Sequence, residues 1–70
     1  MEDIKIRYGR RLREVRLEKG WSQETLANLA EIDRTYIPGL ESGKRNVSLV
    51  VIEKLSSVFK MEISDLLKGI

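Results

Sequence analysis

The sequence predicts an all-α domain of five short helices, and three observations support this class. Apolar residues recur three or four positions apart through most of the chain. Residues that favour helix N-caps or helix ends separate these segments. No stretch alternates apolar and polar residues for long enough to form a strand. With one proline, no repeat and no linker, the 70 residues are expected to form a single domain, 1–70.

The first two expected helices are separated by a glycine and a serine. The first runs over residues 4–19 and ends at Gly20, which favours the left-handed backbone that closes helices. Its apolar face consists of Ile4, Tyr8, Leu12 and Val15. Ser22 is a good N-cap for a second helix over residues 23–30. Trp21, just before this cap, is expected to pack back onto the core.

The third expected helix contains a local conflict. Asp33 is a suitable N-cap for a helix over residues 34–41, with Ile37 and Leu40 on its buried side. Pro38 would then lie beyond the first turn, where it lacks the N–H that a helix interior needs. The helix therefore either bends after its first turn or begins later in the chain.

The last two expected helices carry more apolar surface than one core needs. Ser48 caps a helix that extends to Phe59 or Lys60, and a short helix follows over residues 63–68. Leu49, Ile52 and Phe59 are expected in the core, since a surface helix needs only a narrow apolar stripe. The other apolar residues would form an uncovered edge that self-association buries, and one wide core is the alternative. The expected interface consists of Val51, Leu55, Val58, Ile63, Leu66 and Leu67.

The composition excludes several classes of function. The chain has no cysteine and no histidine, which removes thiolate metal sites and the usual general base at neutral pH. We therefore expect no metal, no cofactor, no small-molecule ligand and no enzymatic activity. No run is apolar enough to cross a membrane, and no signal peptide is visible, so a cytoplasmic location is expected.

The charge distribution hints at an anionic partner. The formal net charge is only +2, but the basic excess lies in the first two thirds of the chain. Ordinary solvation of helix surfaces explains the same distribution.

Residues 22–40 carry the pattern that points to function. Two short helices are joined by a tight turn, and Ala27 lies where a second helix would cross closely. Ile32, Ile37 and Leu40 supply apolar contacts that would set the crossing angle. This geometry is typical of a helix-turn-helix unit, whose second helix enters the major groove of DNA. A plain helical hairpin would show the same spacing, so the pattern alone does not decide.

Several segments resemble the helix-turn-helix family of lambdoid phage repressors and Cro. Residues 12–24 (LREVRLEKGWSQE) are similar to the opening of that family. Residues 33–37 (DRTYI), 39–41 (GLE) and 43–46 (GKRN) are similar to one branch, the controller proteins of restriction–modification systems. Free-standing repressors of many systems share these phrases. The resemblance covers nearly the whole chain.

The resemblance implies a lambda-repressor-like DNA-binding domain, in which the second and third helices form the helix-turn-helix. Such a protein would bind a palindromic operator in double-stranded DNA as a homodimer and regulate transcription. A phage-type repressor is one alternative within the family. An antitoxin-like module that binds another protein through the same fold is a second alternative.

The resemblance also implies roles for individual residues. Arg34 and Thr35 would read bases, Arg34 through a bidentate pair to guanine. Gln23, at a helix N-terminus, would hold a phosphate. The expected DNA-contacting residues are Gln23, Arg34, Thr35, Tyr36, Gly39, Lys44, Arg45 and Asn46.

Four further residues have structural expectations. Arg16 and Glu41 match positions that form a largely buried ion pair, which ties the first helix to the end of the third. Glu31 and Lys60 stand where the family usually has glycine. A left-handed backbone at either position would cost about 1 kcal/mol.

Overall fold

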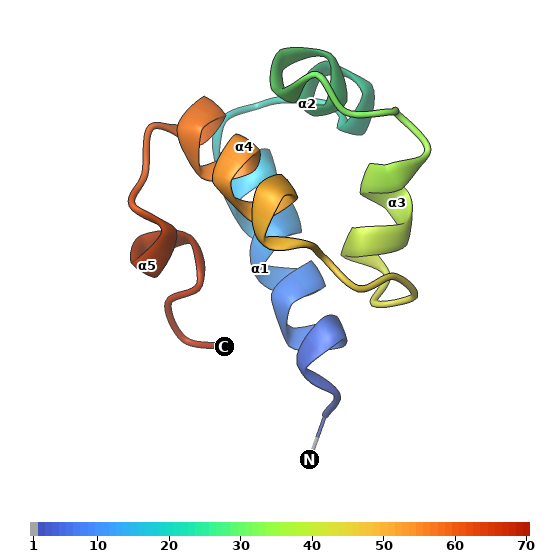
Figure 1. Cartoon of the computed structure of the whole chain (residues 1–70), viewed down its shortest axis with the longest axis vertical. Helices are drawn as coiled ribbons and strands as arrows, with labels where there is room; N and C mark the ends of the chain where they lie inside the picture. Colours follow the sequence, from blue (N-terminus) through green and yellow to red (C-terminus); the bar gives the residue numbers. More distant parts are fainter. Residues whose placement is uncertain (1) are drawn as a thin grey trace.

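Five helices and their connecting turns make up the structure, a computed structural model that describes residues 2–70. The helices are α1 (Ile4–Glu18), α2 (Gln23–Ala30), α3 (Tyr36–Glu41), α4 (Leu49–Phe59) and α5 (Ile63–Leu66) (Figure 1). The all-α class and the five-helix order are confirmed, and residues 2–70 contain no strand. Met1, which the expected single domain includes, lies outside the described residues. No helix within residues 2–70 has the length and apolarity that a membrane span requires.

Local hydrogen bonds explain where the helices begin and end. Ser22 and Ser48 cap α2 and α4 as expected, since each hydroxyl accepts the backbone N–H three residues later. Asp3 caps α1 in a similar way by accepting from the Lys5 backbone N–H. Two non-glycine residues, Glu31 and Lys60, take left-handed backbone angles with φ of 56° and 57° and close α2 and α4. The chain therefore tolerates this strain at the two positions where the family usually has glycine.

Helix α3 begins at Tyr36 and not at Arg34, because Asp33 does not cap it. The Asp33 carboxylate accepts hydrogen bonds from the Thr35 backbone N–H at 2.9 Å and from Thr35 Oγ1 at 2.7 Å. These bonds hold Arg34 and Thr35 in a turn that precedes the helix. Pro38 is consequently in the first turn of α3, where a backbone N–H needs no helical acceptor. The later start resolves the conflict seen in the sequence, and no bend is required.

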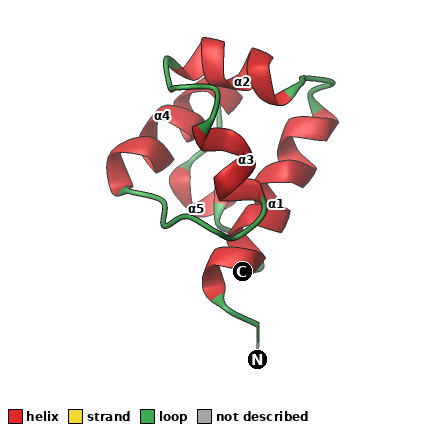
Figure 2. Cartoon of the chain, turned by 90° about the vertical axis from the view of Figure 1, so that its right-hand side faces the viewer, coloured by secondary structure: helices red, strands yellow, loops and turns green. Residues whose placement is uncertain are grey.

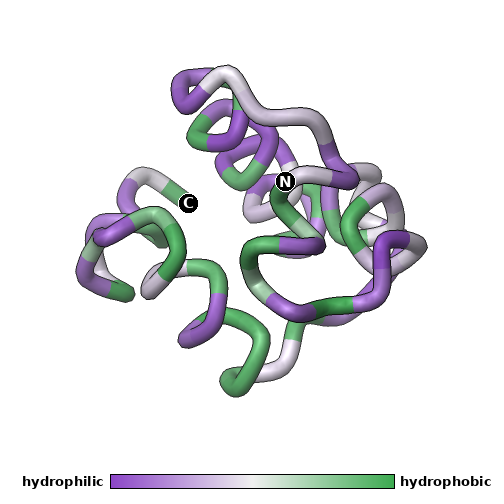
Figure 3. The backbone as a smooth tube through the Cα atoms, turned by 90° about the horizontal axis from the view of Figure 1, so that it is seen from above, coloured by the Kyte–Doolittle hydropathy of each residue, from purple (hydrophilic) through white to green (hydrophobic). Residues whose placement is uncertain are grey.

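The core receives side chains from all five helices. Figure 3 shows hydrophobic and hydrophilic residues alternating along the coiled parts of the backbone, as expected when each helix turns one face inward. The ring of Trp21 stacks on that of Phe59 with 5.7 Å between the centroids, so Trp21 packs onto the core as expected. The largest fully buried side chains are Leu12, Leu26, Ile37, Leu40, Leu55, Phe59 and Leu66.

Two residues expected in the uncovered apolar edge of α4 and α5 lie in the core instead. Leu55 and Leu66 are fully buried, because α5 packs against α4 and α1 and closes the core from that side. The expectation for Leu49 was also wrong, since its side chain is 82% exposed at the start of α4. The remaining members of the expected edge are half-buried or exposed: Val51, Val58, Ile63 and Leu67.

Gly9 allows α1 and α3 to pack closely, a role that the sequence analysis did not detect. A Cβ atom at Gly9 would press on the Leu40 carbonyl oxygen and lie 2.6 Å from that of Glu41. Both obstacles are backbone atoms, which cannot rotate away as a side chain can. We therefore expect Gly9→Ala to lower the free energy of unfolding by about 1–3 kcal/mol in urea denaturation.

Gly39→Ala is the matched control for this prediction. The atoms nearest to a Cβ at Gly39 all belong to the flexible Arg45 side chain, with 2.8 Å to Arg45 Cδ. Arg45 can move, so little change in stability is expected. Equal losses in the two variants would contradict the close packing inferred at Gly9.

Candidate nucleic-acid interface

The residues expected to contact DNA gather along α3, which lies at the right of Figure 1 and faces the viewer in Figure 2. Arg34 and Thr35 are exposed in the turn before the helix. Lys44, Arg45 and Asn46 are exposed in the loop that leaves it. The structure thus places both groups at the two ends of one short helix.

Tyr36 and Gly39 connect this loop to α3. The Tyr36 hydroxyl donates to the Asn46 carbonyl oxygen at 3.4 Å, and the Arg45 guanidinium carbon lies 5.1 Å from the Tyr36 ring centroid. Gly39 leaves room for the aliphatic stem of Arg45, as the short Cβ distances at Gly39 show. Arg45 therefore lies along α3, where its charge stays close to the aromatic face of Tyr36.

Arg34 faces a carboxylate that the sequence analysis missed. Its Nη1 atom lies 3.7 Å from Glu24 Oε2 in the first turn of α2, and the two side chains are 72% and 65% exposed. An ion pair this exposed contributes less than about 1 kcal/mol, so a stronger acceptor can displace Glu24. The turn before α3 is thus next to the N-terminus of α2, although nine residues lie between Glu24 and Arg34 in the sequence.

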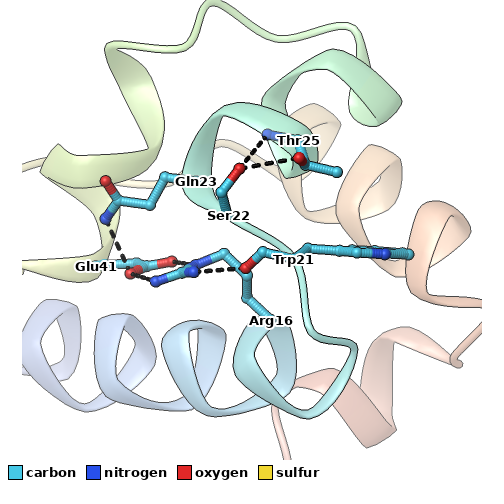
Figure 4. Close-up of polar contacts among 6 residues, drawn as sticks. All are labelled: Arg16, Trp21, Ser22, Gln23, Thr25 and Glu41. Atoms are coloured by element: carbon cyan, nitrogen blue, oxygen red, sulfur yellow. Dashed lines mark hydrogen bonds and ion pairs between the residues drawn. The ribbon is translucent and has the colours of Figure 1, made fainter.

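A buried polar network holds α1, α2 and the end of α3 together (Figure 4). Arg16 donates to the Glu41 carboxylate from Nε at 2.6 Å and from Nη2 at 3.0 Å. The two side chains are only 8% and 4% exposed, which matches the largely buried pair implied by the resemblance. Hydrogen bonding to Glu41 raises the pKa of Arg16. Arg16 also donates from Nη1 to the Trp21 carbonyl oxygen at 2.7 Å.

Gln23 belongs to this network, so its side chain is not fully free to meet a phosphate. Its Nε2 atom donates to Glu41 Oε1 at 3.1 Å, and the residue is half-buried (Figure 4). One amide N–H remains at the start of α2 for another acceptor. The contact fixes the N-terminus of α2 relative to α3.

Two of the basic residues in α1 bind the C-terminal part of the chain, away from α3. Arg11 donates from Nε to the Leu66 carbonyl oxygen at 3.2 Å and from Nη2 to that of Asp65 at 2.8 Å. Arg7 donates to the Ile70 carbonyl oxygen. These bonds tie α1 to the end of α5 and to the last residue of the chain. Part of the basic excess seen in the sequence therefore has a structural role remote from α3.

The Asp33 turn gives a prediction about pH. Hydrogen bonds from the Thr35 hydroxyl, and then from its backbone N–H, hold the pKa of Asp33 below its ordinary value of 3.8. Because the pKa is lowered in the folded state, the turn is stabilised above the unfolded pKa. This stabilisation is lost as the pH falls through the folded value. An NMR titration of the carboxyl carbon should show the low pKa, and Thr35→Val should return it toward 3.8. Thr25→Val is the control, and an unchanged pKa in Thr35→Val would contradict the assignment.

Comparison with known proteins shows which family this chain resembles. A family model described as helix-turn-helix matches residues 12–66. The chain is 48% identical to the control protein C.MunI of a Mycoplasma species, over 100% of this chain and 96% of that protein. It is 44% identical to the control protein C.BamHI of Bacillus amyloliquefaciens, over 93% and 82% of the two chains. Among solved structures, it is similar to the restriction-modification controller protein C.AhdI of Aeromonas hydrophila. That match has a TM-score of 0.85 and 52% identity, and it covers 89% of this chain and 94% of the other.

Proposed function

Because this chain belongs to the helix-turn-helix family, we propose that it binds double-stranded DNA and regulates transcription, as the controller of a restriction–modification system. Its similarity to control proteins over nearly the full length of both chains supports this function. A regulator of this kind would act in the cytoplasm of a bacterial cell. It would be a DNA-binding protein and not an enzyme.

The observation that carries the proposal is the exposure of Arg34 and Thr35 in the turn that leads into α3. In helix-turn-helix proteins, the N-terminal residues of the second helix contact base edges in the major groove. We assign base reading to these two residues, Arg34 through guanine and the Thr35 methyl through thymine. The buried Arg16–Glu41 pair would hold α3 in the orientation that this contact needs.

Phosphate contacts would surround this central pair of residues. Lys44, Arg45 and Asn46 extend from the other end of α3, where their side chains are exposed. Gln23 would meet a phosphate together with the N-terminus of α2, an eight-residue helix. Tyr36 and Gly39 would act through Arg45, whose position they set. Such contacts fix the register of a protein on DNA, whereas base contacts give its specificity.

A homodimer would cover the apolar surface that remains on α4 and α5. Leu49 and Val50 are 82% and 62% exposed, and Ile63 is 41% exposed. The half-buried Val51, Val58 and Leu67 would join them. Leu55 and Leu66 are withdrawn from this interface because they are buried within the chain. Two-fold pairing would place two α3 helices roughly 34 Å apart on a palindromic operator.

The proposal is tested with duplex DNA from upstream of the gene that encodes this chain. Fluorescence anisotropy should show tight binding to a fragment with inverted repeats, and the logarithm of affinity should fall linearly with the logarithm of salt concentration. Sedimentation equilibrium should show a dimer. Equal affinity for a scrambled duplex would exclude a sequence-specific regulator. Absence of any DNA binding would favour the antitoxin-like alternative.

A further inference from the structure

Helix α5 is too short to hold its position by itself. It has four residues, and in the described part of the chain no side chain caps its N-terminus. Isolated helices several times longer are already marginal in water, so packing against the rest of the chain has to fix α5. The proposed homodimer uses residues of this helix. What holds α5 in place therefore affects how the two subunits would meet.

Apolar packing fixes the depth of α5 in the molecule. Leu66 is fully buried, and the half-buried Leu67 packs against the same core. Ile63, one turn before Leu67, is 41% exposed. Hydrophobic contacts are not directional, so they hold a helix against a surface more strictly than they fix its rotation. The direction in which Ile63 and Leu67 face needs a directional contact as well.

Arg11 in the middle of α1 supplies this directional contact. Its guanidinium donates from Nη2 to the Asp65 carbonyl oxygen at 2.8 Å and from Nε to that of Leu66 at 3.2 Å. The remaining nitrogen, Nη1, donates to Glu14 Oε1 at 3.0 Å. Because the guanidinium is planar and rigid, two bonds to successive carbonyl groups fix the direction of the α5 backbone as well as its distance.

The surroundings of Arg11 set it apart from the other basic residues of α1. Its side chain is 19% exposed, whereas that of the neighbouring Arg10 is 61% exposed and pairs with Glu2. All three guanidinium nitrogens of Arg11 are engaged within the chain, and Glu14 provides the countercharge. Arg11 is therefore committed to α5 and is not a free phosphate contact.

We propose that Arg11 is a positioning residue for the homodimer, because it fixes the orientation in which α5 presents Ile63 and Leu67 to a second copy of the chain. This inference rests on the homodimer of the proposed function. It adds that a polar contact inside one subunit sets how tightly two subunits associate. Arg11 acts through the backbone of α5 and not through contact with DNA.

Sedimentation equilibrium of the whole chain, without DNA, tests this role through the dimer dissociation constant. Arg11→Met keeps most of the aliphatic stem and removes all three donors. If α5 then keeps its position in about one third of the molecules, this fraction enters once for each subunit, and the dissociation constant should rise roughly tenfold.

Two further variants show whether the geometry of the guanidinium is what matters. Arg11→Lys keeps the charge but lacks the planar fork, so it should dimerise nearly as weakly as Arg11→Met. Arg13→Met is the matched control, since it removes an exposed arginine from the same helix, and it should dimerise like the parent. Association of Arg11→Lys as tight as that of the parent would show that charge alone is needed, and would contradict the proposal.

A measurement on α5 itself separates positioning from a general loss of stability. In dilute, monomeric samples, amide hydrogen exchange of residues 63–68 should be faster in Arg11→Met than in the parent. Residues 49–59 of α4 should keep the exchange rates of the parent. Equal acceleration in both helices would indicate a general contribution to stability and would overturn the positioning role.

Operator binding provides an independent readout. Where the protein is mostly monomeric, a tenfold weaker dimer should raise the concentration for half-saturation of the operator roughly threefold, because dimer concentration follows the square of monomer concentration. Where the protein is fully dimeric, Arg11→Met should bind the operator as tightly as the parent. Weaker binding there would make Arg11 a phosphate contact, and the proposal would fail.

Failure of this inference and failure of the proposed function have different signatures. A parent that dimerises, together with an Arg11→Met variant that dimerises equally well, would overturn the role of Arg11 and leave the homodimer intact. A parent that stays monomeric at all concentrations would refute the homodimer, and the role of Arg11 would be refuted with it.

Discussion

Replacing Glu41 by alanine should lower the free energy of unfolding by about 3–5 kcal/mol. The change leaves the Arg16 guanidinium buried without its countercharge, and Gln23 loses its acceptor as well. Removing one partner of a buried ion pair costs far more free energy than the intact pair contributes. The remaining charge stays buried, with neither a countercharge nor water to stabilise it. Small domains have only about 5–15 kcal/mol of stability, so the loss should be visible in urea denaturation and as a sharply lower Tm.

Two further variants make this prediction specific. Glu14→Ala breaks the pair with Arg11 on the same helix, in which Glu14 is 59% exposed, and should cost less than about 1 kcal/mol. The double variant Arg16→Met with Glu41→Leu removes both charges and should recover a large part of the loss. If Glu41→Ala had the same Tm as the parent, the Arg16–Glu41 contact would not be what holds α3 in place.

Replacing Arg34 by alanine should weaken operator binding by roughly 10- to 100-fold, which corresponds to about 1–3 kcal/mol for a bidentate contact with guanine. The same variant should lose discrimination at one base pair of each half-site. Stability should hardly change, because Arg34 is exposed and pairs only with the exposed Glu24. Anisotropy titrations with the operator, and with duplexes altered at single positions, measure both effects.

The contrast with lysine variants distinguishes base reading from phosphate contact. Lys44→Ala should weaken binding to all duplexes equally and reduce the slope of log affinity against log salt by about one unit. Lys68→Ala removes a charge just after α5, on the opposite side of α1 from α3, and should leave operator affinity unchanged (Figure 1). If Arg34→Ala behaved like Lys44→Ala, Arg34 would be a phosphate contact and the assignment of base reading would fail.

The sequence by itself determined the order of the helices and the caps of α2 and α4, because these depend on neighbours in the chain. The apolar spacing of α1 and the serines before α2 and α4 are local signals, and each predicted its element correctly. The start of α3 was wrong because two local options competed. The Asp33 side chain could cap a helix at once or close a turn onto Thr35, and only the second lets Pro38 occupy a first turn.

Only the tertiary structure decided which apolar side chains are buried and which basic side chains bind other parts of the chain. Leu55 and Leu49 both lie on the apolar arc of α4, yet one is fully buried and the other is 82% exposed. The elements that pack against α4, which are α2 and α5, cover only part of this arc. Gly9, Glu24 and Arg11 gave no signal in the sequence, because their partners are distant along the chain. Gly9 meets α3, Glu24 meets the turn before α3, and Arg11 meets the end of α5, 55 residues away. Periodicity shows which side of a helix is apolar, but burial depends on which distant element packs against that side. That choice is made by the summed packing of the whole chain.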